Sequence, residues 1–237
     1  MSSEDEVNLQ RKYYAETAAK YDAMQISERD EHQFALAILS AMIEYHDIKS
    51  VLDVGSGTGR ALRYLKARHP GVRFVGIEPV EALRKVGHEA GLRPEELKEG
   101  DVNALAVSDG EFDLVCEFAV LHHVPKPELA VAEMLRVSRK AIFISDANNF
   151  GQGGPAARLL KQAINAMGLW RAFDWLRTAG RGYHVSAGDG LFYSYSAYNN
   201  YGQLRAACRT VHQFNTVDAG ISLVGSAPHV VLFGIKK

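Results

Sequence analysis

Cysteine is scarce in this sequence of 237 residues, which contains only Cys116 and Cys208. Two thiols are too few to build a disulfide-stabilised domain, and their spacing is not that of a metal site. Cys116 lies within an apolar run, so we expect a small buried side chain. A protein with so few thiols is compatible with the reducing cytoplasm, which is the default interpretation.

Long apolar runs and an excess of one charge are also missing. No stretch approaches the roughly 18–20 apolar residues that a membrane span needs. The sequence opens on charged residues without an apolar signal region. The formal net charge is −1, which argues against a polyanionic partner. We therefore expect a cytoplasmic protein, a monomer or homodimer, with neither nucleic acid nor a membrane as partner.

Apolar segments of strand length alternate with helical patterns from residue 50 onward. With 47% hydrophobic residues the chain can bury a sizeable core. Strands are expected at 50–54, 72–77, 97–100, 112–116, 140–145 and 229–235, and helices at 59–68, 80–90 and 126–138. This alternation predicts an α/β fold in which a mostly parallel sheet is covered on both faces.

Two segments lie outside this alternation. Helical patterns at 7–24 and 28–46 predict an N-terminal helical cap over residues 1–46. Residues 147–198 begin with a glycine-rich loop, and two short helices are expected at 156–167 and 170–178. We interpret 147–198 as a substrate-side insertion after the fifth strand, within a single domain spanning 1–237.

The most informative motif is the turn from Asp53 to Gly59, between the first strand and the first helix. Glycines allow a ligand to approach the backbone closely. A dinucleotide site has the spacing G-x-G-x-x-G, whereas this turn has G-x-G-x-G with Asp53 just before it. A carboxylate there repels a pyrophosphate and attracts an ammonium group, and S-adenosylmethionine has an ammonium group and no phosphate.

Three further features follow the ends of successive strands. Glu78 can accept hydrogen bonds from both ribose hydroxyls of an adenosine. Asp101 can accept from an adenine amino group. The segment Glu117–Val124 faces the place where a methyl group would be transferred.

In this order, these features resemble the class I S-adenosylmethionine-dependent methyltransferases, especially the type 11 group. The matching pieces lie within about residues 10–146 and read LDVGSGTG, GIEP, EGDVNAL and FDLVCEFAVLHHVPKPELAVAEMLRV. The resemblance implies a Rossmann-like, seven-stranded, mostly parallel sheet with helices on both faces. Its implied strand order is 3-2-1-4-5-7-6, with strand seven antiparallel and a mostly helical insertion after strand five.

The resemblance also implies S-adenosylmethionine as the cofactor. The implied cofactor-binding residues are Tyr13, Tyr21, Asp53, Gly55, Ser56, Gly57, Gly59, Glu78, Pro79, Asp101, Val102, Asn103, Glu117 and Phe118. Two of them, Tyr13 and Tyr21, belong to the helix that resembles the family's cap over the cofactor.

Transfer to an oxygen or nitrogen calls for a general base. His123 is the first candidate, followed by His122 and His184. Adjacent side chains point in different directions, so at most one of His122 and His123 should face the site, and a purely structural role is an equal alternative. Asp146, Tyr193 and Tyr195 are expected on the acceptor side, under a roof formed by residues 183–198. No cluster calls for a metal.

The predicted function is methyl transfer to an oxygen or nitrogen of a small molecule, such as a sugar, a phenol or a natural-product intermediate. One alternative is a non-catalytic protein that binds S-adenosylmethionine or S-adenosylhomocysteine. A nicotinamide-dependent oxidoreductase is the other, and the glycine spacing and Asp53 argue against it.

Overall fold

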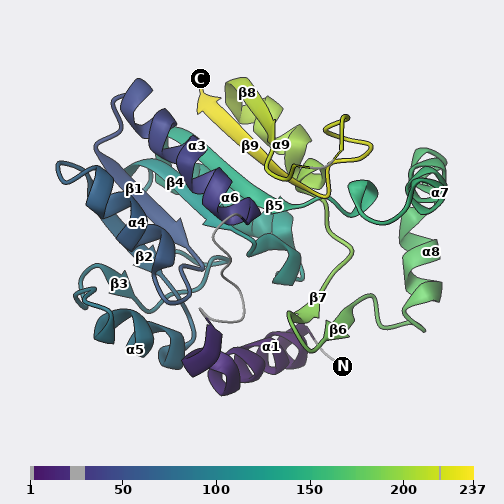
Figure 1. Cartoon of the computed structure of the whole chain (residues 1–237), viewed down its shortest axis with the longest axis horizontal. Helices are drawn as coiled ribbons and strands as arrows, with labels where there is room; N and C mark the ends of the chain where they lie inside the picture. The colour runs from purple at the N-terminus through teal and green to yellow at the C-terminus, as the bar shows by residue number, and fades with distance from the viewer. Residues whose placement is uncertain (1–2, 22–29, 219) are drawn as a thin grey trace.

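A seven-stranded sheet forms the centre of the computed structural model, which describes residues 3–21, 30–218 and 220–237 (Figure 1). The strands of this sheet are β1 (Ser50–Val54), β2 (Arg73–Ile77), β3 (Leu97–Lys98), β4 (Phe112–Phe118), β5 (Ser138–Ala147), β8 (Cys208–Asn215) and β9 (His229–Lys236). Their order is β3-β2-β1-β4-β5-β9-β8, with β9 antiparallel to both neighbours. Since β6 and β7 form a separate hairpin, this is the predicted order, and the predicted fold is confirmed.

Helices cover both faces of the sheet because the central strands are apolar on both sides. All five residues of β1 are buried. On one face lie α3 (Glu31–Tyr45) and α4 (Arg60–Arg68), which bury Leu36 and Leu62 in one hydrophobic cluster. On the other lie α6 (Pro127–Val137) and α9 (Tyr201–Ala207), which bury Met134 and Leu204. The helix α5 (Glu81–Glu89) lies beside the β2–β3 edge, and it corresponds to the helix expected at 80–90.

The edge strand β8 was not predicted from the chain's apolar pattern, although the family resemblance implied a strand there. Among the described strands, it pairs with β9 alone. A strand at an edge needs no continuous apolar run, and Arg209 and Thr210 are exposed. The polar sequence of β8 therefore reflects its position at the edge.

The N-terminal cap divides into two parts. The helix α1 (Ser3–Thr17), followed by the short η1 (Ala18–Lys20), lies across the end of the sheet to which β1 points (Figure 1). In contrast, α3 packs on the face of the sheet. Only the first part of the expected 1–46 cap thus lies over the carboxyl ends of the strands. The expected helix end at 22–24 and helix start at 28–29 lie outside the described residues.

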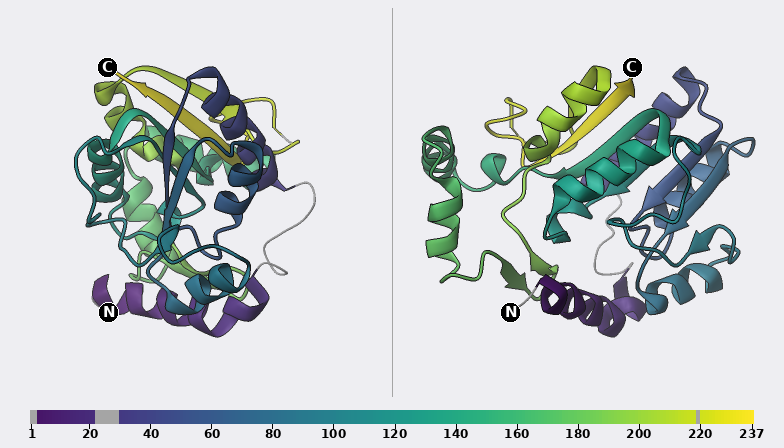
Figure 2. Two further views of the ribbon diagram at one scale, coloured as in Figure 1. Left: turned by 90° about the vertical axis from the view of Figure 1, so that its left-hand side faces the viewer. Right: turned by 180° about the vertical axis from the view of Figure 1, so that it is seen from behind.

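The insertion after β5 contains the two expected helices and an unexpected hairpin. Its elements are η3 (Asn149–Gly151), α7 (Pro155–Ala166), α8 (Trp170–Arg177), β6 (His184–Ser186), β7 (Gly190–Phe192) and η4 (Ala197–Asn200). The hairpin packs against α1, while α7 and α8 stand away from the sheet (Figures 1 and 2). Within the described ranges, no helix has the length and apolar character that a membrane span requires.

Candidate active site

The turn after β1 has a conformation that glycine permits. Gly55, Gly57 and Gly59 have φ values of 71°, 55° and 72°. A Cβ atom on Gly55 would lie 2.4 Å from Cγ2 of Val120, so a larger residue would collide there. The amides of Gly55 and Ser56 both donate to the carbonyl of Ile77, at 2.8 and 3.0 Å. These contacts hold the turn against the end of β2.

Glu78 lies just beyond β2, directly against this turn. Its side chain is buried, and its carboxylate accepts hydrogen bonds from the amides of Gly57 at 3.0 Å and Val80 at 2.9 Å. Burial raises the pKa of Glu78, and the two amides oppose that rise. Each amide uses one carboxylate oxygen, so both oxygens keep a lone pair for a hydroxyl group.

Asp53 is a buried carboxylate at the other side of the same turn. It is 2% exposed, and the thiol of Cys116 lies 3.8 Å from its Oδ1. Burial raises the pKa of Asp53 to about 7, although hydrogen bonds from Ser56 and Cys116 act against this. A cationic ligand placed here would stabilise the ionised form. Asp53 therefore fits the ammonium group of a methionine moiety.

Asp101 marks the third strand end and is half-exposed. Its Oδ1 accepts from the backbone and side-chain nitrogens of Asn103, at 2.8 and 2.9 Å. Its Oδ2 pairs with Arg11 of α1 at 2.7 Å. Arg11 was not predicted, because its partner is far away in the sequence. The pair joins α1 to the loop in which an adenine ring is expected.

Two cavities meet at this end of the sheet. A smaller one, of about 130 Å³, is lined by the strand-end residues that sequence analysis assigned to the cofactor, among them Gly57, Glu78, Pro79, Asp101, Val102 and Asn103. A larger one, of about 970 Å³, is lined by Asp53, Ser56 and the insertion. Both cavities are bordered by Tyr14, Tyr21, Gly55, Phe118, Ala119 and His123. A ligand that extended from one cavity to the other would pass these side chains.

His122 belongs to η2 (Leu121–His123) and forms a buried pair with Asp146, at 2.7 Å between Nδ1 and Oδ1. The other oxygen of Asp146 accepts from the amides of Leu121 and His122. Asp146 is completely buried, so its expected place facing the acceptor is wrong; it positions His122 instead. Burial disfavours the imidazolium, but Asp146 and Asp189 outweigh this and raise the pKa of His122 to about 10.

His123 has the opposite electrostatic character. Its Nδ1 donates to the carbonyl of Leu191 at 2.6 Å, which leaves Nε2 as an acceptor for the hydroxyl of Tyr14 at 2.8 Å. Burial lowers the pKa of His123, and the neighbouring charge of His122 lowers it further. Of the two adjacent histidines, His123 is thus the neutral one. Both line the larger cavity, so the expectation that at most one would face the site is wrong, but His123 alone borders the smaller cavity as well.

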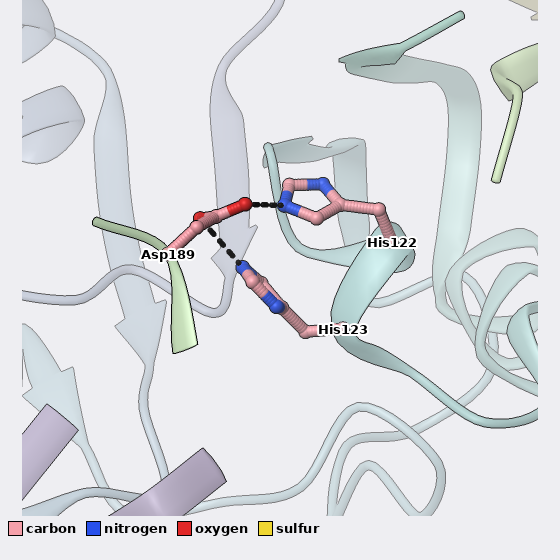
Figure 3. A group of neighbouring side chains, drawn as sticks. All are labelled: His122, His123 and Asp189. Atoms are coloured by element: carbon pink, nitrogen blue, oxygen red, sulfur yellow. Dashed lines mark ion pairs between the residues drawn. The ribbon is translucent and has the colours of Figure 1, made fainter. Parts of the chain in front are cut away.

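Asp189 faces both histidines, with one carboxylate oxygen directed toward each ring, as Figure 3 shows. Its carboxylate oxygens are 3.5 Å from Nε2 of His122 and 3.4 Å from Nε2 of His123. The three donor atoms lie within 4.8 Å of one another, a spacing that could hold a metal ion. However, the raised pKa of His122, about 10, keeps its Nε2 protonated toward Asp189, so this nitrogen has no lone pair for a metal. Sequence analysis missed Asp189 because nothing in the local sequence connects it with residues 122 and 123.

Contacts from α1 fasten the β6–β7 hairpin over the larger cavity. Gln10 accepts from the amide of Leu191 at 2.5 Å and donates to the carbonyl of Asp189 at 3.0 Å. Tyr13 donates to the carbonyl of Ala187, so it faces the hairpin and lines neither cavity. The expectation for Tyr13 is therefore wrong, and Tyr14, the next residue, borders the site instead.

The predicted acceptor residues of the insertion differ in where their polar atoms point. Tyr193 lines the larger cavity, and its hydroxyl donates to Glu6 of α1 at 2.7 Å. Tyr195 is buried, and its hydroxyl donates to Asn200 at 2.8 Å, so only its ring borders the cavity. His184 also lines this cavity.

His184 stacks on Phe192, and its Nε2 lies 3.0 Å from Nη2 of Arg177. Because the guanidinium group of Arg177 can only donate, Nε2 of His184 accepts this hydrogen bond. Burial and then the charge of Arg177 lower the pKa of His184. Its accepting nitrogen is already used, so His184 is less suited than His123 to take a proton.

Besides Tyr13, two predicted cofactor residues do not border either cavity. Glu117 is completely buried, and its carboxylate accepts from the amides of Val120 and Ser145, both at 2.9 Å. Gly59 precedes α4, and a Cβ atom there would lie 2.1 Å from Leu92. Glu117 and Gly59 therefore shape the loops around the site rather than its surface.

Comparisons with known proteins agree with this geometry. Residues 52–143 match a family model described as a methyltransferase domain. A phosphatidylethanolamine N-methyltransferase of Cereibacter sphaeroides is 37% identical over 117 residues, which are 47% of this chain and 56% of that protein. A ubiquinone biosynthesis O-methyltransferase of Hahella chejuensis is 30% identical over 151 residues, 55% of this chain and 62% of that protein. The chain thus spans somewhat more than half the length of these relatives.

Among solved structures, a Burkholderia thailandensis 1,6-didemethyltoxoflavin-N1-methyltransferase resembles the whole chain. It was crystallised with 1,6-didemethyltoxoflavin and S-adenosylhomocysteine. The two share 18% sequence identity with a TM-score of 0.61, over 100% of this chain and 91% of the other. At this identity the likeness concerns the fold.

Proposed function

We propose that this chain transfers a methyl group to an oxygen or nitrogen of a small-molecule acceptor. By its fold and by the match over residues 52–143, the chain belongs to the class I S-adenosylmethionine-dependent methyltransferases. The family predicted from the sequence is confirmed. The two relatives are named as an N- and an O-methyltransferase, which leaves both acceptor atoms open.

The residues at the strand ends fit the cofactor. Asp53 would hold its ammonium group and Glu78 the ribose hydroxyls, since both are buried carboxylates with unused acceptor capacity. The apolar part of the smaller cavity, around Val102 and Pro79, would hold the adenine ring. Bound S-adenosylmethionine supplies an electrophilic methyl group on its sulfonium. Holding the acceptor atom in line with this methyl group can lower the barrier by roughly 7–11 kcal/mol.

A proton must leave an acceptor hydroxyl or amine as its oxygen or nitrogen is methylated. Tyr14 and His123 stand where the two cavities meet. The acceptor proton would pass to the Tyr14 oxygen while the Tyr14 proton moves to Nε2 of His123 along their hydrogen bond of 2.8 Å. Nδ1 keeps its own proton, which it donates to the carbonyl of Leu191, so a charged imidazolium results. His122 and His184 have no part in this route.

The single observation that carries the proposal is the common border of the two cavities. The smaller cavity has carboxylates suited to a nucleoside, Glu78 and Asp101, whereas the larger cavity contains Asp53, suited to an ammonium group, and is roofed by the insertion. Incubation with labelled S-adenosylmethionine and a panel of phenols, amines and amphiphilic acceptors tests it. Methyl transfer is expected. Binding of S-adenosylhomocysteine without transfer to any acceptor would favour a non-catalytic binding protein, and nicotinamide binding would favour an oxidoreductase.

A further inference from the structure

The helix α7 is amphipathic, but it has the reverse of the usual orientation. Arg158, Lys161 and Gln162 follow one face, and each donates to a backbone carbonyl of the protein: Gly153, Asn149 and Phe150 respectively. Gln162 also donates to Gly225 at 2.8 Å. The polar face is thus turned toward the protein. A surface helix normally turns its apolar face inward.

The apolar face of α7 is consequently exposed. No residue of α7 is buried, and Leu159 is 71% and Met167 62% exposed. Next to it, α8 adds Trp175 at 57% and Leu176 at 70%. With helical periodicity, the exposed apolar side chains of α7 share one stripe. We call the exposed set the apolar face of the α7–α8 hairpin; it consists of Leu159, Leu160, Met167, Leu169, Trp175 and Leu176.

The charge of the hairpin identifies what this face fits. Between Pro155 and Arg181 the sequence has five cationic side chains and one carboxylate, although the whole chain has a net charge of −1. In the described part of the chain, only Arg177 of these five forms an ion pair, with Asp174 at 2.9 Å. Arg158 and Lys161 belong to the face turned toward the protein, so the exposed cations without an ion pair are Arg171 and Arg181. Exposed apolar side chains with a tryptophan, flanked by unpaired cations, match the interface of an anionic lipid bilayer.

We propose that the apolar face of the α7–α8 hairpin docks peripherally on an anionic membrane surface. A protein surface would satisfy the apolar side chains equally, but it would leave the cations without a general partner. The expectation of no membrane partner rested on the lack of a spanning segment, which does not bear on a helix lying in the interface.

Docking would bring the larger cavity near the bilayer, on the side of the hairpin that faces the protein. Leu160 and Lys161 of α7, and Phe173 and Arg177 of α8, line that cavity as well. An amphiphilic acceptor could enter with its polar group first while its apolar part stayed at the lipid surface. This consequence rests on the proposed methyl transfer; the docking itself does not.

Sedimentation with lipid vesicles tests the docking on the whole chain. Binding should be strong to vesicles that contain phosphatidylglycerol, weak to pure phosphatidylcholine, and reduced by salt. The combined variant Leu159→Ser, Met167→Ser and Leu176→Ser should lower the partition coefficient by about tenfold or more, since three apolar side chains are lost from the interface. Tyr45→Ser removes an exposed aromatic side chain at the end of α3, away from the hairpin, and should leave binding unchanged. Arg171→Gln with Arg181→Gln should abolish the preference for anionic vesicles.

Circular dichroism and S-adenosylhomocysteine affinity, unchanged in every variant, would show that each one is folded. Equal vesicle binding by the parent and the serine variant would overturn the proposal. A second outcome would also overturn it: the parent does not bind vesicles but forms concentration-dependent dimers in analytical ultracentrifugation, and the serine variant does not. The apolar face would then be an interface between two copies of this chain. A protein that binds vesicles but not S-adenosylhomocysteine would retain the docking and refute the proposed function.

Discussion

The hydroxyl of Tyr14 donates a hydrogen bond of 2.8 Å to Nε2 of His123, across 109 residues of sequence. The bond joins α1 to η2 where the two cavities meet. Since Nδ1 of His123 is already fixed by the carbonyl of Leu191, the ring has one tautomer and one basic nitrogen. In the proposed reaction, this pair would carry a proton away from the acceptor.

Tyr14→Phe should lower kcat by roughly tenfold to a hundredfold, because the acceptor proton loses its route to Nε2. S-adenosylhomocysteine affinity, measured by titration calorimetry, should stay within about threefold of the parent, since the lost bond serves the chemical step. Tyr13→Phe is the matched control: its hydroxyl bonds to Ala187 instead, so kcat should be retained. An equal loss in both variants would assign Tyr14 a structural role.

Glu78→Ala should weaken S-adenosylhomocysteine binding by about tenfold to a hundredfold, which corresponds to roughly 1.5–3 kcal/mol for hydrogen bonds to a charged group. The variant also leaves the amide of Gly57 without its acceptor, so Glu78→Gln separates the two effects. Glutamine keeps one acceptor oxygen and should lose less affinity. Glu81→Ala, an exposed acid nearby on α5, should change nothing. Unaltered affinity in a folded Glu78→Ala protein contradicts the assignment.

Affinity for S-adenosylhomocysteine should rise with pH up to about 7 and then level off. In the free protein, burial raises the pKa of Asp53 to about 7, so this carboxyl is protonated at lower pH. A bound ammonium group favours the ionised form, and binding therefore releases a proton below that pH. The gain approaches about tenfold per pH unit in the steepest part. Calorimetry from acid to neutral pH measures it, and Asp53→Asn should flatten the curve; a parent that shows no pH dependence would speak against this role.

Gln10→Ala should loosen the hairpin that roofs the larger cavity. The variant removes the acceptor of the Leu191 amide and the donor to the Asp189 carbonyl. Amide hydrogen exchange in β7 should become faster by about tenfold, the equivalent of one hydrogen bond. Mass spectrometry of the segment 184–192 reads this directly. Gln203→Ala, which removes a bond to Glu128 on the far side, is the control and should leave that segment unchanged.

The strand ends could be predicted because their signals are local. Asp53, Glu78 and Asp101 each follow an apolar strand, and parallel strands bring such ends together. The residues that sequence analysis missed, among them Arg11 and Asp189, act on partners at least 66 positions away (189 − 123 = 66). Apolar periodicity does not report such pairings. The same limit explains Asp146, whose position at a strand end gave no indication that its carboxylate turns inward to His122.

Methyl transfer should not require a metal, although His122, His123 and Asp189 have the spacing of a metal site. Asp146 and Asp189 outweigh the effect of burial and raise the pKa of His122 to about 10, so its ring is protonated at neutral pH and has no lone pair for a metal. His123 has one unprotonated nitrogen, Nε2, and it accepts the hydrogen bond from Tyr14. A divalent cation would have to displace both the proton and this hydrogen bond. Dialysis against a chelator should therefore leave kcat unchanged, and added Zn²⁺ or Mg²⁺ should not raise the melting temperature. Activity that is lost on chelation and restored by one of these ions would show instead that the cation, rather than the proton, balances Asp189.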